Sequence, residues 1–316
     1  MTRFVMLLFS VISAGTAWAI SADAKLLSLV PPGAEIVAGI TAPRSPDQPD
    51  SFVLTTHNNT VDLEDFYALT GADSTRIIHQ IVFVAMTDGN GQLSEHSLLV
   101  YGHFDQPHLF KSAADGGATA TSYHRIPVLE IAPFARERGT FNDARWLAVL
   151  DSSVLIFGSI SNTRLELDRY LARSQPDASL LRRLARLRSN QQTWCILSSS
   201  VRTLSSPALD QQIRSVLSTL NPELAELSQL GDEFEFGVHY GRHVEFEYDV
   251  TMASTQENRS DQASHLPSPL EPAKNALLPE LNTVSNAHRL HGVIVVPVLR
   301  YNRWLDEIRR ARSPLN

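Results

Sequence analysis

The segment FEFGVHYGRHVEFEYDV, residues 234–250, alternates apolar and polar side chains along most of its length. Successive side chains of a β-strand point to opposite faces, so this alternation predicts a hairpin with one apolar face. A two-residue loop of Gly241 and Arg242 would place Tyr240 opposite His243 and mix the two faces. A three-residue loop that includes His243 joins apolar residues to apolar residues instead. The predicted pairs are Tyr240 with Val244, Val238 with Phe246, and Phe236 with Tyr248.

The other face of this predicted hairpin is polar, and the same register places His239 opposite Glu245 and Glu235 opposite Asp249. Two interpretations remain open. Imidazole and carboxylate groups are zinc ligands, so His239, His243 and Glu245 are a candidate metal site, with His243 turning inward from the loop. The alternative, which we favour, is a half-exposed hairpin with a polar outer face and one favourable His–Glu pair.

The order of predicted elements is typical of an α+β protein with two ferredoxin-like halves, each running β-α-β-β-α-β. The first half is predicted to contain strands at 35–41, 77–86, 97–104 and 122–131 and helices at 61–69 and 106–114. The second half is predicted to contain strands at 193–199 and 289–298, the hairpin at 234–250, and helices at 209–220 and 271–287.

These elements divide the chain into five parts: 1–19, 20–131, 132–190, 191–300 and 301–316. The first is a predicted signal peptide, the second and fourth are the two α+β halves, and the last is a C-terminal helix. The third is a connector with a hairpin at 146–157 and two helices. The first of these helices is opened by Thr163 and Glu166, which have capping-box spacing, and the second spans 180–187.

Residues 1–19 have the features of an export signal. Arg3 provides a positive start, residues 4–12 an apolar core, and Ala17-Trp18-Ala19 a cleavage site. We therefore expect a mature chain that begins near Ile20 and is periplasmic or secreted. The apolar core is short for a membrane span, although an uncleaved N-terminal anchor remains the alternative. No later run is long and apolar enough to cross a membrane.

Charge and cysteine usage narrow the possible partners. Without Arg3 the chain carries 26 basic and 34 acidic residues, a net charge of −8. This balance argues against nucleic acid as a partner.

Cys195 is the sole cysteine, so an exported chain forms no internal disulfide. Its neighbours Trp194 and Ile196 indicate a buried strand and an inert core thiol rather than a nucleophile.

The sequence LVPPGAEIVAGI, residues 29–40, resembles the mature start of a group of uncharacterised exported bacterial proteins that are common among acidobacteria. These continue with a helix, a turn like Gly71-Ala72-Asp73 and a step like Gly102-His103-Phe104-Asp105. The similarity lies mainly in residues 26–131. It implies export and an α+β fold, and it implies no reaction.

A second candidate metal group consists of His103, Asp105 and His108. Asp105 precedes Gln106-Pro107, an order typical of a helix N-cap with proline in the first turn. We favour the cap over the ligand set. The basic stretch at 182–188 is amphipathic; an anionic partner or a phospholipid surface is one interpretation, and a solvated helix face is the one we favour.

The usual signatures of phosphate loops, dinucleotide-binding turns, serine hydrolases and zinc proteases are absent from the sequence. We therefore favour an exported, non-enzymatic envelope protein that binds or scaffolds an envelope protein or ligand and needs no cofactor. Two alternatives remain open. One is a metal-dependent hydrolase that uses a histidine cluster with zinc, and the other is a carrier of a hydrophobic ligand.

Overall fold

The structure is a computed structural model of the whole chain. It describes residues 23–41, 53–56, 59–62, 78–87, 93–132, 134–136, 139–141, 144–188, 191–198, 233–251, 281–286, 289–301 and 303. Within these ranges no helix is both long and apolar enough to pass through a bilayer.

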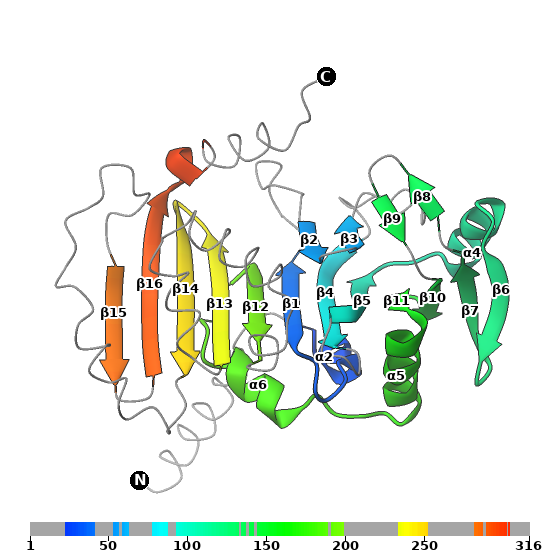
Figure 1. The fold of residues 1–316 in the computed structure, drawn as a ribbon, viewed down its shortest axis with the longest axis horizontal. Coiled ribbons are helices and arrows are strands. Elements are labelled where there is room, and N and C mark those ends of the chain that lie inside the picture. The colour runs from blue at the N-terminus through cyan, green and yellow to red at the C-terminus, as the bar shows by residue number, and fades with distance from the viewer. Residues whose placement is uncertain are drawn as a thin grey trace, which may run out of the picture.

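One 12-stranded sheet dominates the described residues, and every pairing in it is antiparallel (Figure 1). Two small hairpins lie beside it. They are β2 (Val53–Thr56) with β3 (Asn59–Asp62), and β8 (Phe134–Arg136) with β9 (Gly139–Phe141). From one edge to the other the large sheet contains β15 (Leu281–Asn286), β16 (Arg289–Pro297), β14 (His243–Thr251), β13 (Glu233–Tyr240), β12 (Thr193–Leu197), β1 (Ile36–Thr41), β4 (Ile78–Thr87), β5 (Leu93–Gly102), β11 (Val154–Ser159), β10 (Arg145–Leu150), β7 (Ile126–Ile131) and β6 (Thr119–Tyr123).

The predicted pair of ferredoxin-like halves is wrong. In a split β-α-β motif a crossover places a later strand between two earlier ones. Here the strands of the C-terminal part follow one another as neighbours, β12 next to β13, then β14, then β16. The predicted connector, 132–190, supplies β10 and β11 to the same sheet. The strands of both predicted halves and of the connector are therefore antiparallel neighbours in one continuous sheet in place of two separate ones.

Several predicted elements also differ from the observed ones. Residues 281–286, placed in a helix by the sequence, form β15, and the start of the helix predicted at 61–69 belongs to β3. The remaining residues of those two helices, and the helix predicted at 209–220, lie outside the described residues. The strand predicted at 122–131 is part of a hairpin, because His124 and Arg125 have φ values of 48° and 71° and turn the chain between β6 and β7.

Apolar residues are buried on both faces of the sheet. The helices with described bounds that accompany it are α2 (Ala24–Leu29), α4 (Gln106–Asp115), α5 (Ile160–Leu171) and α6 (Ala178–Leu184). Figure 1 shows α6, α2 and α5 in a row below the sheet and α4 beside β6 and β7. Leu26, Leu167 and Leu180 from the first three helices join one core, whereas Leu109 of α4 joins the other.

Two glycines allow large aromatic rings to lie flat against neighbouring strands. Gly39 is paired with Trp194, and a Cβ atom at position 39 would lie 2.2 Å from the Trp194 ring. Gly292 is paired with Tyr248 in the same way, with a distance of 2.3 Å. Because real side chains do not approach so closely, any larger residue at these two positions would displace a fully buried ring.

Candidate functional site

The hairpin of β13 and β14 has the register predicted from its sequence. Tyr240 is paired with Val244, Phe236 with Tyr248, and His239 with Glu245. The apolar face is part of the core, where Phe234, Val238, Val244, Phe246, Tyr248 and Val250 are all buried. The alternation of apolar and polar residues was sufficient to predict this register, because only one register places every apolar residue on the same face.

The polar face of this hairpin is buried away from its loop, so its interpretation as a half-exposed outer face is wrong there; His239 and Glu245, next to the loop, are partly exposed. The Glu235 and Asp249 side chains are fully buried, and Glu247 is 2 % exposed. The basic stretch at 182–188, which begins in α6, covers these carboxylates. The interpretation of this stretch as a solvated helix face is therefore wrong for part of its residues. Arg182 is exposed, but Arg183 is buried.

Three arginines of this stretch contact the acidic side chains of the hairpin. Arg183 Nε donates to Glu235 Oε1 at 2.6 Å, and Arg186 Nη1 donates to Glu233 Oε2 at 2.6 Å. Arg188 Nη1 donates to Glu245 Oε2 at 3.1 Å. We call the following group the acid–arginine cluster: Arg183, Arg186, Arg188, Arg289, Glu233, Glu235, Glu245, Glu247, Asp249 and His291.

Burial raises the pKa of Glu235, although Arg183 and Arg186 favour its charged form. At the other end of the cluster, the hydrogen bond to Asp249 raises the pKa of Arg289. The cluster pairs four guanidinium groups with five carboxylates, and His291 Nδ1 lies 3.2 Å from Asp249 Oδ2. Each of the five carboxylates has at least one ion-pair partner among the described residues, so the cluster fastens the segment of α6 to the sheet.

Two residues of the candidate metal site have other side-chain partners, and the third is exposed. His239 Nδ1 lies 3.0 Å from Gln192 Oε1, Glu245 is paired with Arg188, and His243 is exposed at the start of β14. Among the residues that the structure describes, no three His, Cys, Asp or Glu side chains are grouped so as to hold a metal ion. Zinc at this site stays a prediction that metal analysis of the purified protein would test.

Asp105 is the N-cap of α4, as predicted. Its carboxylate accepts a hydrogen bond from His108 N at 3.2 Å, and proline lies in the first turn. The His103 ring packs edge-on against His79, with 5.1 Å between ring centroids.

Cys195 packs against the core, and burial raises the pKa of its thiol to about 12. A thiol with such a pKa stays protonated at neutral pH and is a poor nucleophile.

A second buried polar group lies under α5. Ser97 donates a hydrogen bond to Glu166, whose side chain is fully buried. Burial raises the pKa of Glu166 to about 8, against the effect of that hydrogen bond. Within the described part of the chain, Glu166 Oε2, the Asn162 amide and Thr163 Oγ1 have no hydrogen-bond partner. Thr163 and Glu166 therefore do not cap α5; Ser159 is the N-cap, and its hydroxyl accepts from Asn162 N.

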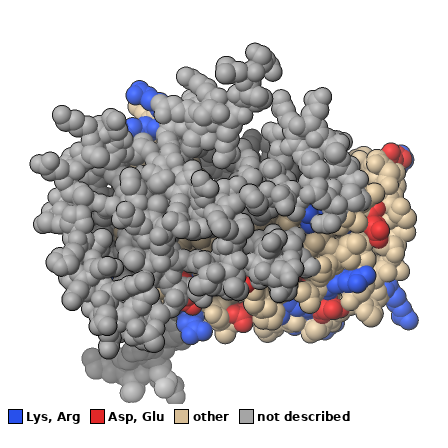
Figure 2. All heavy atoms as spheres, in the orientation of Figure 1, with Lys and Arg blue, Asp and Glu red and all other residues tan. Residues whose placement is uncertain are grey.

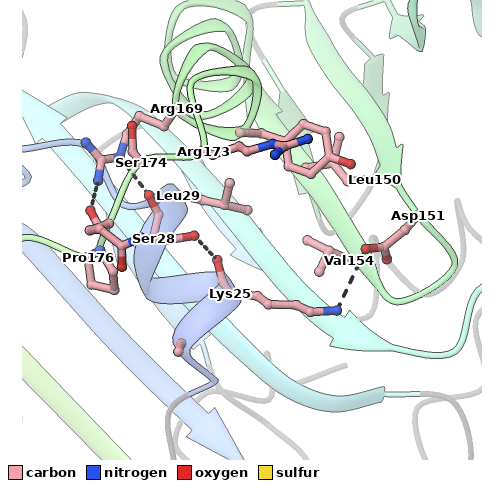
Figure 3. Close-up of a pocket in the computed structure, with 13 residues that line it drawn as sticks. Lys25, Ser28, Leu29, Leu150, Asp151, Val154, Arg169, Arg173, Ser174 and Pro176 are labelled. Carbon is pink, nitrogen blue, oxygen red and sulfur yellow. Dashed lines mark hydrogen bonds and ion pairs between the residues drawn. The ribbon is translucent and has the colours of Figure 1, made fainter.

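A pocket of about 390 Å³ opens between α2, the end of α5 and the β10–β11 turn. Figure 3 shows how side chains from these three segments surround it. Leu29, Leu150 and Val154 provide apolar lining, and Lys25, Arg169 and Arg173 provide positive charge. Pockets of this size with mainly apolar walls and a few polar groups are typical small-molecule sites.

Two of the charged residues around this pocket hold its walls together. Arg169 Nε donates to the Ser28 carbonyl at 2.8 Å, and Arg169 Nη2 donates to the Gln175 carbonyl at 2.7 Å. Lys25 Nζ lies 3.8 Å from Asp151 Oδ2. Burial by itself would raise the pKa of Asp151, but hydrogen bonds from Ser153 and the charge of Lys25 outweigh burial and lower it. Asp151 is therefore anionic at neutral pH.

Arg173 has an unusual backbone conformation. Its φ is 51°, in the left-handed region that glycine normally occupies after a helix. Arg173 N donates to the Tyr170 carbonyl, and Ser174 N donates to the Arg169 carbonyl, which are the two bonds of a Schellman motif. The Arg173 side chain is exposed, and among the described residues it has no hydrogen-bond or ion-pair partner. In Figure 3 it extends from the end of α5 toward the β10–β11 hairpin.

No motif in the sequence indicates this pocket. Its lining comes from short pieces near residues 24–29, 150–154 and 169–176, and none of these pieces forms a motif by itself. One local signal was available in the order Ala172-Arg173-Ser174-Gln175-Pro176. Pro176 marks a helix end, and the position where glycine is expected holds arginine instead.

No protein-family model matches the sequence, and no curated protein matches it. One solved structure, titled "Structure of crystal form I of TP0453", is similar at 11 % identity with a TM-score of 0.48, over 91 % of this chain and 99 % of that chain. A likeness at this level carries no argument about fold or function, and the resemblance of residues 26–131 to exported bacterial proteins stays a prediction.

Proposed function

We propose that this protein is an exported, non-enzymatic binding protein whose ligand is a small organic anion with an apolar body. The ligand would occupy the pocket between α2, α5 and the β10–β11 turn. One observation carries the proposal: Arg173 lines this pocket from a left-handed backbone position and has no partner among the described residues. Export itself is a proposal that rests on the signal-like residues 1–19.

The backbone of Arg173 supports a role for its side chain. A residue other than glycine in the left-handed conformation costs about 1–2 kcal/mol. Glycine at this position would form the same Schellman motif without that cost. Strained residues of this kind are concentrated at functional sites, where the side chain contributes something that glycine cannot. The guanidinium of Arg173 is such a group, because it can bind a carboxylate or a phosphate through two parallel hydrogen bonds.

The remaining charges around the pocket favour an anion. The guanidinium of Arg169 donates to two backbone carbonyls, and the charge of Asp151 is balanced by Lys25. Arg173 is then the charged group available to a ligand, next to apolar side chains from α2 and from the β10–β11 hairpin. Leu29, Leu150 and Val154 would contact an apolar body. This arrangement suits a carboxylate or phosphate attached to a short hydrocarbon chain.

Binding is better supported than catalysis. The residues that line the pocket include no histidine and no cysteine, and its carboxylate, Asp151, is held by Ser153 and Lys25. General acid–base catalysis requires a group that can exchange a proton near the operating pH. A carboxylate with a lowered pKa does not meet that requirement at neutral pH.

Calorimetric titration with octanoate, octyl phosphate and 1-octanol tests this proposal. We expect either anion to bind and the neutral alcohol to bind far more weakly, and the stronger of the two anions identifies the preferred headgroup. Arg173→Gly should weaken anion binding about 10- to 100-fold, because a charge-assisted hydrogen bond contributes about 1.5–3 kcal/mol.

Two controls separate binding from folding. Arg173→Gly should not reduce the free energy of unfolding, because relief of about 1 kcal/mol of backbone strain offsets the entropic cost of glycine, about 0.5–1 kcal/mol. Arg182→Gly removes an exposed arginine from α6 and should leave binding unchanged. Equal affinity of wild type and Arg173→Gly for both anions would refute the proposal, as would binding of octanol as strongly as octanoate.

A further inference from the structure

The edge of the large sheet formed by β6 is open. In the described sheet β6 pairs with β7 alone and is the last strand on its side, and Figure 1 shows nothing drawn beyond it. Residues 119–122 are exposed, so β6 projects past the cores that bury the central strands. An edge strand in this position presents backbone donors and acceptors that another strand can pair with.

The turn next to β6 determines which backbone groups face outward. Tyr123 and Ile126 flank the two-residue turn at His124 and Arg125, so they form a hydrogen-bonded pair. Hydrogen-bonded and open pairs alternate along an antiparallel ladder. Ser122, opposite Pro127, is therefore in an open pair, which suits a proline without an N–H. It follows that Ala120 and Ser122 direct their N–H and carbonyl groups away from β7.

This edge has none of the features that usually prevent pairing between molecules. The strand TATSY contains no charged residue and no proline, and its register with β7 has no bulge. Proteins usually protect open edges with such features. At this end of the molecule, the described residues in Figure 2 show isolated charged side chains separated by uncharged surface.

We infer that β6 pairs with β6 of a second copy of this chain, in an antiparallel arrangement with Thr121 on the two-fold axis. Ala120 then lies opposite the partner's Ser122, and their outward backbone groups meet. Thr119 lies opposite the partner's Tyr123, and no two like charges face each other within the paired residues. A two-fold axis brings the same surface of both copies together, so one self-complementary strand is sufficient.

A second copy fits this edge better than an unrelated extended peptide. Peptides that add to a sheet edge gain specificity from pockets that hold alternate side chains. Both faces of β6 are exposed along residues 119–122, so the edge has no walls to select such side chains. Five residues from each copy bury less than the roughly 1,200 Å² of a stable interface. We therefore expect a weak dimer that forms at high protein concentration.

Cysteine cross-linking tests the register directly. Thr121→Cys should form an intermolecular disulfide under mild oxidation, because residues in an open antiparallel pair have Cα atoms about 4.5 Å apart, within disulfide range. Thr119→Cys is the matched control, since its two copies would lie about 13 Å apart along the strand, too far for a disulfide. The native Cys195 does not interfere, because its thiol is held in the core.

Sedimentation equilibrium between about 10 μM and 1 mM provides the second test, with concentrations chosen for a weak interface. Wild type should dimerise, and Ala120→Pro should remain monomeric, because proline removes an outward N–H while leaving the ladder with β7 intact. An unchanged denaturation curve would confirm that this variant folds. Monomeric wild type at 1 mM, dimerisation of Ala120→Pro at the wild-type level, or equal cross-linking of the two cysteine variants would overturn the inference.

Discussion

At the scale of single residues, Glu166 is a described side chain whose surroundings conflict with its chemistry. It is fully buried under α5, its hydrogen bond comes from Ser97, and burial raises its pKa to about 8. The unfolded chain releases this proton near the ordinary pKa of 4.5. Between these two values the folded state holds a proton that the unfolded state has lost, so stability falls as the pH rises.

Glu166→Gln should remove this pH dependence, because glutamine is neutral and similar in shape. Wild type should lose on the order of 5 kcal/mol of its free energy of unfolding between pH 4.5 and pH 8 through Glu166. The variant should lose much less, and it should be the more stable protein at pH 8.5. Denaturant unfolding at pH 5 and pH 8.5 measures the difference. Glu130→Gln, an exposed substitution on β7, is the control, and parallel profiles for all three proteins would contradict the assignment.

At the scale of elements, α6 and the β13–β14 hairpin depend on each other. Leu180 and Leu184 of α6 join the core, while Arg183 of the same helix contacts Glu235 on the sheet. A buried ion pair adds little net stability, because its attraction is offset by the loss of water around both charges. Removal of Arg183 is costly, however, since the fully buried Glu235 then keeps only the longer ion pair with Arg186, at 3.2 Å, and much of its charge is left uncompensated.

Arg183→Met should therefore reduce the free energy of unfolding by about 3–5 kcal/mol. The double variant Arg183→Met/Glu235→Leu should recover most of this loss, because neither charge then remains in the interior. Arg182→Met changes the exposed neighbour on the same helix and should have an effect within about 0.5 kcal/mol. Urea denaturation of the four proteins provides the comparison. A double variant no more stable than Arg183→Met would rule out this explanation.

An element could be predicted from the sequence where residues close together in the chain determine it. The β13–β14 register could be predicted because alternation between Phe234 and Val250 permits one consistent pairing. The burial of its polar face could not, because the covering arginines come from a separate segment. The β6–β7 turn was missed since His124 and Arg125 adopt positive φ without the glycine or asparagine that usually indicates such a turn.

At the scale of the whole molecule, two buried groups with opposite pKa shifts limit the pH range of greatest stability. Burial, with a contribution from Arg145, lowers the pKa of His96 to about 3 from its usual 6.5. Between these values the unfolded state binds a proton that the folded state does not, so stability rises with pH. Glu166 has the opposite effect between 4.5 and about 8.

These two effects oppose each other between pH 4.5 and 6.5, so we expect a plateau of stability there and a decline on each side. Thermal unfolding measured from pH 3 to pH 9 would reveal the plateau. His96→Gln should weaken the decline on the acid side only, while Glu166→Gln should weaken it on the alkaline side only. A wild-type maximum above pH 8 would contradict this account.

The overall architecture was the least predictable feature. The strands at 35–41, 77–86 and 97–104 were placed close to β1, β4 and β5, but the order of elements does not determine which strands become neighbours. The ferredoxin-like pattern requires a helix before the last strand, where residues 281–286 instead form β15. The candidate pocket was beyond prediction for a related reason, because only the folded sheet brings its three segments together.

The position of β1 has a consequence for how the chain is assembled. It precedes every other strand of the large sheet in sequence, yet it lies in the middle, with β4 on one side and β12 on the other. As the chain is synthesised, β4 arrives early, whereas β12 follows only after α6. Until β12 has been synthesised, one side of β1 is an unpaired edge, although it lies in the middle of the completed sheet. Interruption of synthesis in that interval would leave the unpaired edge of β1 available for pairing with the wrong chain.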